Sequence, residues 1–121
     1  MAITSAANLG PADVAIALSH SGTTADTIDA ANQARRRGAT TVAITNFVSS
    51  PLAVMADVVL TTVTNETTFR SGAMAGRRAA LIVVDCLFVA VAQRRFVATT
   101  EALVRTSEAV ASRRRAARRR L

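Results

Sequence analysis

Short apolar runs alternate with amphipathic stretches along the first half of the chain. The runs cover residues 14–18, 41–45 and 58–61. The first run has almost no polar interruption between Gly10 and Ser19, so its pattern predicts a strand that is buried on both faces. The other two runs are similar in length and character, and they predict a second and a third strand.

Two helices are predicted between these strands. In residues 24–37, apolar side chains recur every three positions from Ile28, arginines fill the last turn, and Gly38 follows as a C-terminal cap. Pro51 opens a short second helix over residues 52–56, in the first-turn position that proline tolerates. This alternation predicts an α/β fold in three layers, with a parallel sheet flanked by helices.

The second half of the chain predicts helices alone. Residues 71–94 lack turn residues, and their block 81–91 is apolar nearly all round, so we expect it to be covered by a second copy of the chain. Cys86 in that block is expected to be a small core residue. We divide the chain into a domain of residues 1–97 and a C-terminal helix of residues 98–121, whose last ten residues we expect to fray because like charges repel.

The charge of the chain is concentrated at its C-terminal end. The formal net charge is +7 and all fifteen cations are arginines, six of them in the last nine residues. Up to Ser112, nine arginines face eight acidic residues, so the body is nearly neutral. The tail is consistent with nonspecific binding to nucleic acid, with an acidic partner or with no dedicated function, and the last interpretation is favoured because isolated charge runs are usually solvated.

Composition and length exclude several other classes of protein. Aromatic residues make up 3% of the chain, which argues against single-stranded nucleic-acid binding by base stacking. The N-terminus lacks the features of a signal peptide, and the longest apolar stretch, 79–92, is shorter than the roughly 20 residues of a membrane span. The single cysteine fits a reducing cytoplasm. One histidine and one cysteine provide no zinc cluster, so neither a metal nor a cofactor is expected.

The candidate chemistry lies in residues 19–24, with the sequence SHSGTT. This segment leaves the carboxyl end of a predicted strand and enters a helix, which is where open α/β sheets bind ligands. Its hydroxyl and imidazole side chains donate hydrogen bonds, Gly22 permits a tight turn, and the helix N-terminus adds free N–H groups and a partial positive charge. The segment therefore predicts a phosphate site built from neutral donors.

A simpler interpretation gives these residues no ligand. Thr23 or Thr24 would cap the helix, and Asp26 would complete a sequence that imitates a capping box. From residue types alone the two interpretations are about equally supported. The segment has no lysine and one glycine, so it is neither a Walker A loop nor a dinucleotide fingerprint, and ATP and NAD are disfavoured.

Three blocks of the chain make the prediction more specific. DVAIALSHSGTTADTIDAANQARRRGATTVAITN, SPLAVMADVVLTT and ETTFRSGAMAGRRAALIVVDCLFVAVAQR follow one another over residues 10–95. Together they resemble the sugar-isomerase (SIS) domain, in the version carried by RpiR-type transcriptional regulators. The resemblance implies a parallel sheet flanked by helices, and a loop that grips the phosphate of a phosphosugar.

Carried over to this sequence, the resemblance implies the following binding residues. Ser19, Ser21 and Thr24 are hydroxyl donors, Gly22 forms the turn, and the backbone amides from Ser21 to Thr23 are further donors. His20 stands where related enzymes often have glutamine, so it is a candidate contact to the sugar. The resemblance also places Glu66 near the ligand, and Arg70 is a weaker candidate for a second contact.

The chain departs from the family's pattern at its beginning. An SIS domain normally starts with a further strand and helix, and residues 1–9 are too short to contain them. RpiR-type regulators also carry an N-terminal helix-turn-helix domain, which this chain lacks, so DNA binding is expected only through such a segment elsewhere. Three strands alone make a poor free-standing sheet. The sequence therefore resembles the C-terminal part of a regulator, with a partial SIS domain.

The sequence favours a non-catalytic effector domain that binds a sugar phosphate and forms a homodimer or a higher homo-oligomer. The alternative is a ketose-aldose isomerase of sugar phosphates, in which Glu66 would move the proton between C1 and C2 with His20 as a helper. A solvated loop glutamate is the more common state of such a residue.

Overall fold

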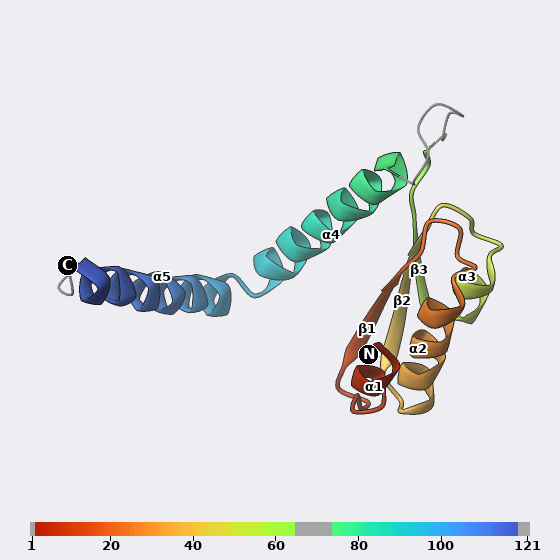
Figure 1. The fold of residues 1–121 in the computed structure, drawn as a ribbon, viewed down its shortest axis with the longest axis horizontal. Helices are drawn as coiled ribbons and strands as arrows, with labels where there is room; N and C mark the ends of the chain where they lie inside the picture. Colours follow the sequence, from red (N-terminus) through yellow and green to blue (C-terminus); the bar gives the residue numbers. More distant parts are fainter. Residues whose placement is uncertain (1, 65–73, 119–121) are drawn as a thin grey trace. The chain divides into compact units, whose positions relative to one another are not determined.

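The computed structural model describes residues 2–64 and 74–118, with residues 112–118 as backbone only. The chain divides into two compact units, Met1–Val84 and Asp85–Leu121, which are considered separately. The first unit contains β1 (Val14–Leu18), β2 (Thr40–Thr45) and β3 (Val58–Thr61), parallel and in the order β1-β2-β3 (Figure 1). The three predicted strands and their parallel pairing are confirmed.

Helices cover one face of this sheet. They are α1 (Ala2–Ala6), α2 (Ala25–Arg36) and α3 (Pro51–Met55). Side chains alternate between the two faces of a strand, and the sheet presents small residues to the helices, so their backbones approach closely. Two clusters result, around Ala34 with Ala39 and around Ala43 with Leu52, all of them buried. Helix α1 was not predicted from the sequence.

Glycine ends α2 as the sequence predicts. Arg37 is the C-cap residue, and Gly38 follows with a φ of 86°. The N–H of Gly38 donates to the carbonyl of Arg35 at 2.9 Å, and the N–H of Ala39 donates to that of Ala34 at 3.1 Å. These two bonds form a Schellman motif, which satisfies carbonyls that the helix end leaves open.

The prediction that β1 is buried on both faces is wrong. Val14, Ile16 and Leu18 point to the face opposite α2, and their exposed fractions are 58%, 48% and 42%. The first turns of α4 (Met74–Arg94) share a cavity with Leu18 and not with the earlier residues of β1. Periodicity shows that a strand is apolar, and it does not show how far along the strand the covering layer extends.

A carboxylate ties β2 to the start of β3. Asp57 accepts hydrogen bonds from the backbone N–H of Thr41 at 2.8 Å and from its hydroxyl at 2.7 Å. These bonds hold the pKa of the Asp57 carboxyl below its usual range, with a smaller contribution from the positive charge of Arg35 and against a small opposing effect of desolvation.

The apolar block of α4 is largely exposed in the described chain. Leu81, Ile82 and Phe88 each expose more than half of their surface. Cys86 is also exposed, so the expectation that it is a core residue is wrong. The apolar composition of a helix predicts that its surface needs a covering partner. Within the described residues of unit 85–121, no other element buries Cys86. None of the helices in the described ranges has both the length and the apolar character needed to cross a bilayer.

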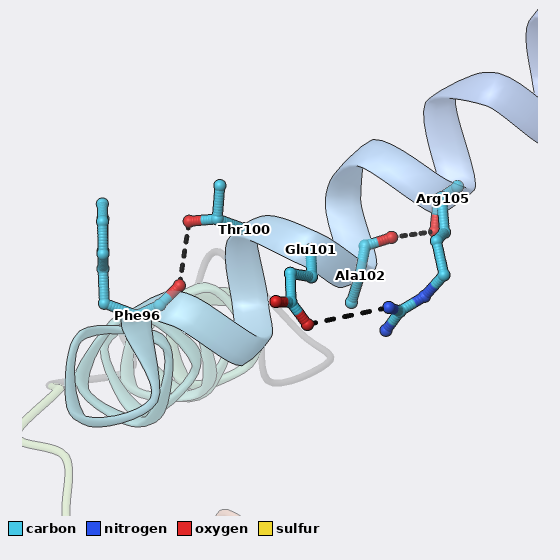
Figure 2. A network of polar contacts seen from close by, with 6 residues as sticks. Phe96, Thr100, Glu101, Ala102 and Arg105 are labelled. Atoms are coloured by element: carbon cyan, nitrogen blue, oxygen red, sulfur yellow. Dashed lines mark hydrogen bonds and ion pairs between the residues drawn. The ribbon is translucent and has the colours of Figure 1, made fainter.

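Helix α5 (Phe96–Arg118) is stabilised by local contacts along its own surface. Figure 2 shows the Thr100 hydroxyl donating to the carbonyl of Phe96 at 2.8 Å, and Arg105 facing Glu101 one turn away at 3.8 Å. Both charged side chains are exposed, so their ion pair contributes little to stability. The helix extends to Arg118 and so includes most of the segment that we expected to fray.

Candidate functional site

Residues 19–24 form a tight turn between the carboxyl end of β1 and the first turn of α2, which we call the hydroxyl turn. The N–H of Gly22 donates to both the carbonyl and the hydroxyl oxygen of Ser19, each at 3.1 Å. Gly22 has a φ of 67°, and a Cβ there would collide with the side chain of Ser50 and lie 3.0 Å from the Thr45 hydroxyl. Only glycine fits this position without strain, as the sequence predicts.

The hydroxyls of this turn associate in two pairs. Ser19 Oγ lies 3.0 Å from Thr24 Oγ1, and Ser21 Oγ lies 2.8 Å from Thr23 Oγ1. The N–H groups of Gly22 and Thr23 donate to the serine oxygens of these pairs. Within a pair one hydroxyl donates to the other, so the second hydroxyl keeps its proton for another acceptor. The turn thus presents one O–H donor from each pair.

The first turn of α2 is not capped by a side chain. Thr24 is the N-cap residue, with φ −66° and ψ 113°, yet its hydroxyl makes no capping hydrogen bond and faces Ser19 instead. The interpretation in which a threonine hydroxyl caps this helix is therefore wrong. The first N–H groups of a helix have no acceptor within it, so an anion at this end would receive their hydrogen bonds and the favourable field of the helix dipole.

Neighbouring elements hold the turn in place. The carbonyl of His20 accepts hydrogen bonds from the Thr45 hydroxyl at 3.1 Å and from the N–H of Asn46 at 3.0 Å, both at the carboxyl end of β2. The carbonyl of Gly22 accepts from the N–H of Leu52 in α3 at 3.1 Å. The buried Thr45 is 1% exposed. The turn is therefore anchored through its main chain, and these anchoring bonds do not use its side chains.

A cavity of about 300 Å³ opens beside the turn. Ser19 and His20 form one part of its wall, and the ring of His20 meets Phe47 edge-on, with 5.9 Å between the ring centres. This volume is at the lower end of the range for small-molecule sites. The cavity is lined by the carboxyl ends of the strands and the first turns of α4: Leu18, Ser19, His20, Ile44, Thr45, Thr62, Gly76, Arg77, Ala80 and Leu81.

A larger groove of about 470 Å³ lies elsewhere on this unit, between α1, α2 and β1. Its walls are mostly apolar, with residues such as Leu9, Ala15 and Ala30. It follows the outer edge of β1, which has no neighbouring strand within the described ranges. Its side-chain donors are the hydroxyls of Ser5 and Thr27 alone, and Asp26 adds a negative charge, so the cavity at Ser19 and His20 is the better candidate for an anion.

The structure brings together most of the residues that the sequence singled out. The six residues of the turn lie at the carboxyl end of β1, whereas Glu66 and Arg70 lie outside the described residues. Sequence reasoning missed Thr45 and Asn46, although Thr45 ends the second strand, Asn46 follows it, and the same rule about strand ends would have found both. It also missed Arg77, because the sequence of residues 71–94 does not show which side chain of that helix meets the turn.

Comparison with known proteins agrees with this geometry. The SIS domain profile matches residues 2–90, which include the whole sheet, the hydroxyl turn and the first turns of α4. The chain belongs to the SIS domain family. The fold expected from the resemblance is thereby confirmed.

Relatives of this SIS domain include transcriptional regulators. An uncharacterized HTH-type transcriptional regulator of Caldanaerobacter subterraneus subsp. tengcongensis is 43% identical over 111 residues, which are 92% of this chain and 39% of the relative. The NanR protein of Vibrio vulnificus, solved in complex with ManNAc-6P, has a TM-score of 0.77 at 30% identity, covering 90% of this chain and 41% of NanR.

A third likeness is to the sugar isomerase domain of an RpiR transcription factor from Sphaerobacter thermophilus. Its TM-score is 0.66 at 30% identity, and the match covers 86% of this chain and 57% of that one. The present chain therefore spans between 39% and 57% of the length of these three relatives.

Proposed function

We propose that this SIS domain is the ligand-sensing part of a transcriptional regulator of the RpiR type and binds a phosphosugar without converting it. The regulators among its relatives support this proposal, and one of them was solved with a phosphosugar bound. The carrying observation is the uncapped amino end of α2, where Thr24 turns its hydroxyl to Ser19 and leaves the helix N–H groups open.

In this proposal the phosphate lies at the amino end of α2. On binding, the hydroxyls of Ser19, Ser21 and Thr24 give up their bonds within the two pairs and donate to the phosphate oxygens. The backbone N–H groups of Ser21 to Thr23 donate as well, and those of Gly22 and Thr23 exchange their serine acceptors for the phosphate. Gly22 allows the main chain to approach closely. Such a site uses the partial charges of amides and hydroxyls and contains no lysine.

The sugar would extend from the phosphate into the cavity of about 300 Å³. His20 lines this cavity and is the proposed contact to the sugar hydroxyls, and Glu66 is the proposed second contact. In sensing, the ligand stabilises one arrangement of a homodimer over another, and a DNA-binding helix-turn-helix segment outside this sequence responds to that shift. A regulator of this kind acts in the cytoplasm.

The homodimer is proposed to form through the apolar block of α4. Phe88, Val89 and Val91 each expose about half of their surface or more, and apolar surface of this extent is rarely left in water.

The test is calorimetric titration of the full chain with N-acetylmannosamine 6-phosphate, with ketose and aldose hexose phosphates, and with unphosphorylated N-acetylmannosamine. We expect binding of at least one phosphorylated sugar, none of the unphosphorylated one, and loss of binding in Ser21→Ala. No binding of any phosphosugar at millimolar concentration would contradict the proposal.

The same mixtures are examined for interconversion of ketose and aldose phosphates. We expect no turnover. Turnover that disappears in Glu66→Gln would identify an isomerase and overturn the non-catalytic part of the proposal, because that carboxylate is the base an isomerase would need.

A further inference from the structure

The first turns of α4 close one side of the cavity next to the hydroxyl turn. Gly76 is buried in this wall, and a Cβ at this position would collide with the imidazole of His20. The backbone of α4 therefore packs directly against a residue of the turn. This contact fixes the backbone position of the following residue, Arg77.

Arg77 lines the same cavity as Ser19 and His20. Among the described residues of the cavity wall it has the one permanent positive charge, since the other polar members are hydroxyl side chains and one histidine. Its side chain is otherwise exposed to solvent, which places it at the opening of the cavity. The next residue, Arg78, is equally exposed and does not line the cavity.

A phosphate monoester carries a charge of about −1.5 to −2 at neutral pH. The turn of residues 19–24 offers only hydroxyls, amides and a helix end worth roughly half a positive charge. Much of the negative charge would therefore remain unbalanced beside a cavity whose walls include Leu18, Ile44 and Leu81. Guanidinium groups bind phosphate through paired N–H donors and keep their charge at any physiological pH.

We infer that Arg77 binds the anionic part of the ligand from the α4 wall of the cavity and sets the preference for charged over neutral sugars. The inference rests on the proposed phosphosugar function and assigns to α4 a share in recognition that the hydroxyl turn alone does not provide. Because a full charge is involved, Arg77 also makes ligand affinity fall as ionic strength rises.

The experiment compares the full-length wild type with Arg77→Ala, Arg77→Lys and Arg78→Ala. Each protein is titrated with N-acetylmannosamine 6-phosphate and glucose 6-phosphate at low and at high salt. We expect Arg77→Ala to weaken binding by about ten- to a hundredfold and to flatten its salt dependence. The Arg77→Lys variant should recover part of the affinity, because it keeps the charge and loses the paired donors. Arg78→Ala, the matched control, should bind like the wild type.

The two levels of the proposal fail in different ways. If the wild type binds phosphosugars, and Arg77→Ala and Arg78→Ala bind them with equal affinity, the role of Arg77 is overturned and the sensing function stands. Wild type that binds no phosphosugar overturns both. Thermal melts of each variant show whether it is folded, and the salt dependence of the wild type gives a second measurement that requires no substitution.

Discussion

The hydroxyl oxygens of Ser19 and Thr24 lie 3.0 Å apart and join the carboxyl end of β1 to the first turn of α2. This contact uses the one side chain that stands in the N-cap position of α2, so the amino end of the helix remains open. The relationship explains how a segment with the composition of an ordinary capping sequence serves as a site for an anion.

Replacing Thr24 by valine should separate binding from capping. The Thr24→Val variant keeps the shape of the side chain and removes the hydroxyl, so we expect phosphosugar affinity to fall roughly tenfold with the loss of one hydrogen bond to a charged group. Stability should change by less than about 1 kcal/mol, because no capping bond is lost. Calorimetry and urea denaturation measure the two quantities, and Thr24→Ser, which retains the hydroxyl, is the control. Unchanged affinity with a stability loss of about 2 kcal/mol would show that Thr24 is a cap after all.

The Gly22→Ala variant should damage the turn itself. The left-handed backbone of Gly22 disfavours any side chain by about 1–2 kcal/mol, and a Cβ there must also displace Ser50, so we expect a stability loss above that range together with loss of ligand binding. Gly10→Ala is the matched control, since the nearest atom to a Cβ there is 3.9 Å away. Urea denaturation compares the two, and equal midpoints would contradict the structure of the turn.

Acid should weaken the link between β2 and β3. The folded chain holds the pKa of Asp57 below its ordinary value of 3.8, because Thr41 donates two hydrogen bonds to the carboxylate. Well above pH 3.8 the group is charged in both states and its contribution to stability is complete, and this contribution is lost as the pH falls through the folded pKa. We therefore expect the urea midpoint of Asp57→Asn to be lower than that of wild type at neutral pH, and the difference to shrink below pH 4. A difference that stays constant across this range would refute the assignment.

The exposed apolar block of α4 should cause self-association. Wild type at micromolar concentration is expected to scatter light as a dimer or larger species, and Phe88→Asp should shift it towards the monomer, because a charge in an apolar interface is left without a partner. Val54→Asp, at a still more exposed position in α3, serves as the control and should not change the mass. A monomeric wild type would rule out this interface.

The order of strands and helices could be predicted from local patterns. Residues 14–18 and 58–61 are short apolar runs between polar or turn-forming neighbours, and the structure has strands with these bounds. Burial could not be predicted in the same way, because it depends on layers that lie far away in the sequence. Ile16 and Cys86 have apolar surroundings in sequence, yet no layer covers them in the described part of the chain.

The hydroxyl turn of the candidate site could be predicted from the sequence. The wall that the first turns of α4 contribute could not. The turn is contiguous and follows a predicted strand, so Ser19 to Thr24 could be singled out as candidates, and the family resemblance favoured a phosphate site over a simple cap. Arg77 comes more than fifty residues later and reaches the cavity only because Gly76 packs on His20. A pattern of charges along a helix does not reveal which arginine meets a distant loop. Asn46 differs from Arg77 in this respect, because it directly follows β2 and the rule about strand ends could have found it.

The main chain of the hydroxyl turn is fixed before any ligand arrives, since the carbonyls of His20 and Gly22 already accept hydrogen bonds from Thr45, Asn46 and Leu52. An incoming ester has little backbone to immobilise there, so less of its interaction energy is consumed in ordering the protein. The remainder is available to draw neighbouring helices into a new arrangement, which is what a receptor requires if a small metabolite is to change the behaviour of a much larger molecule.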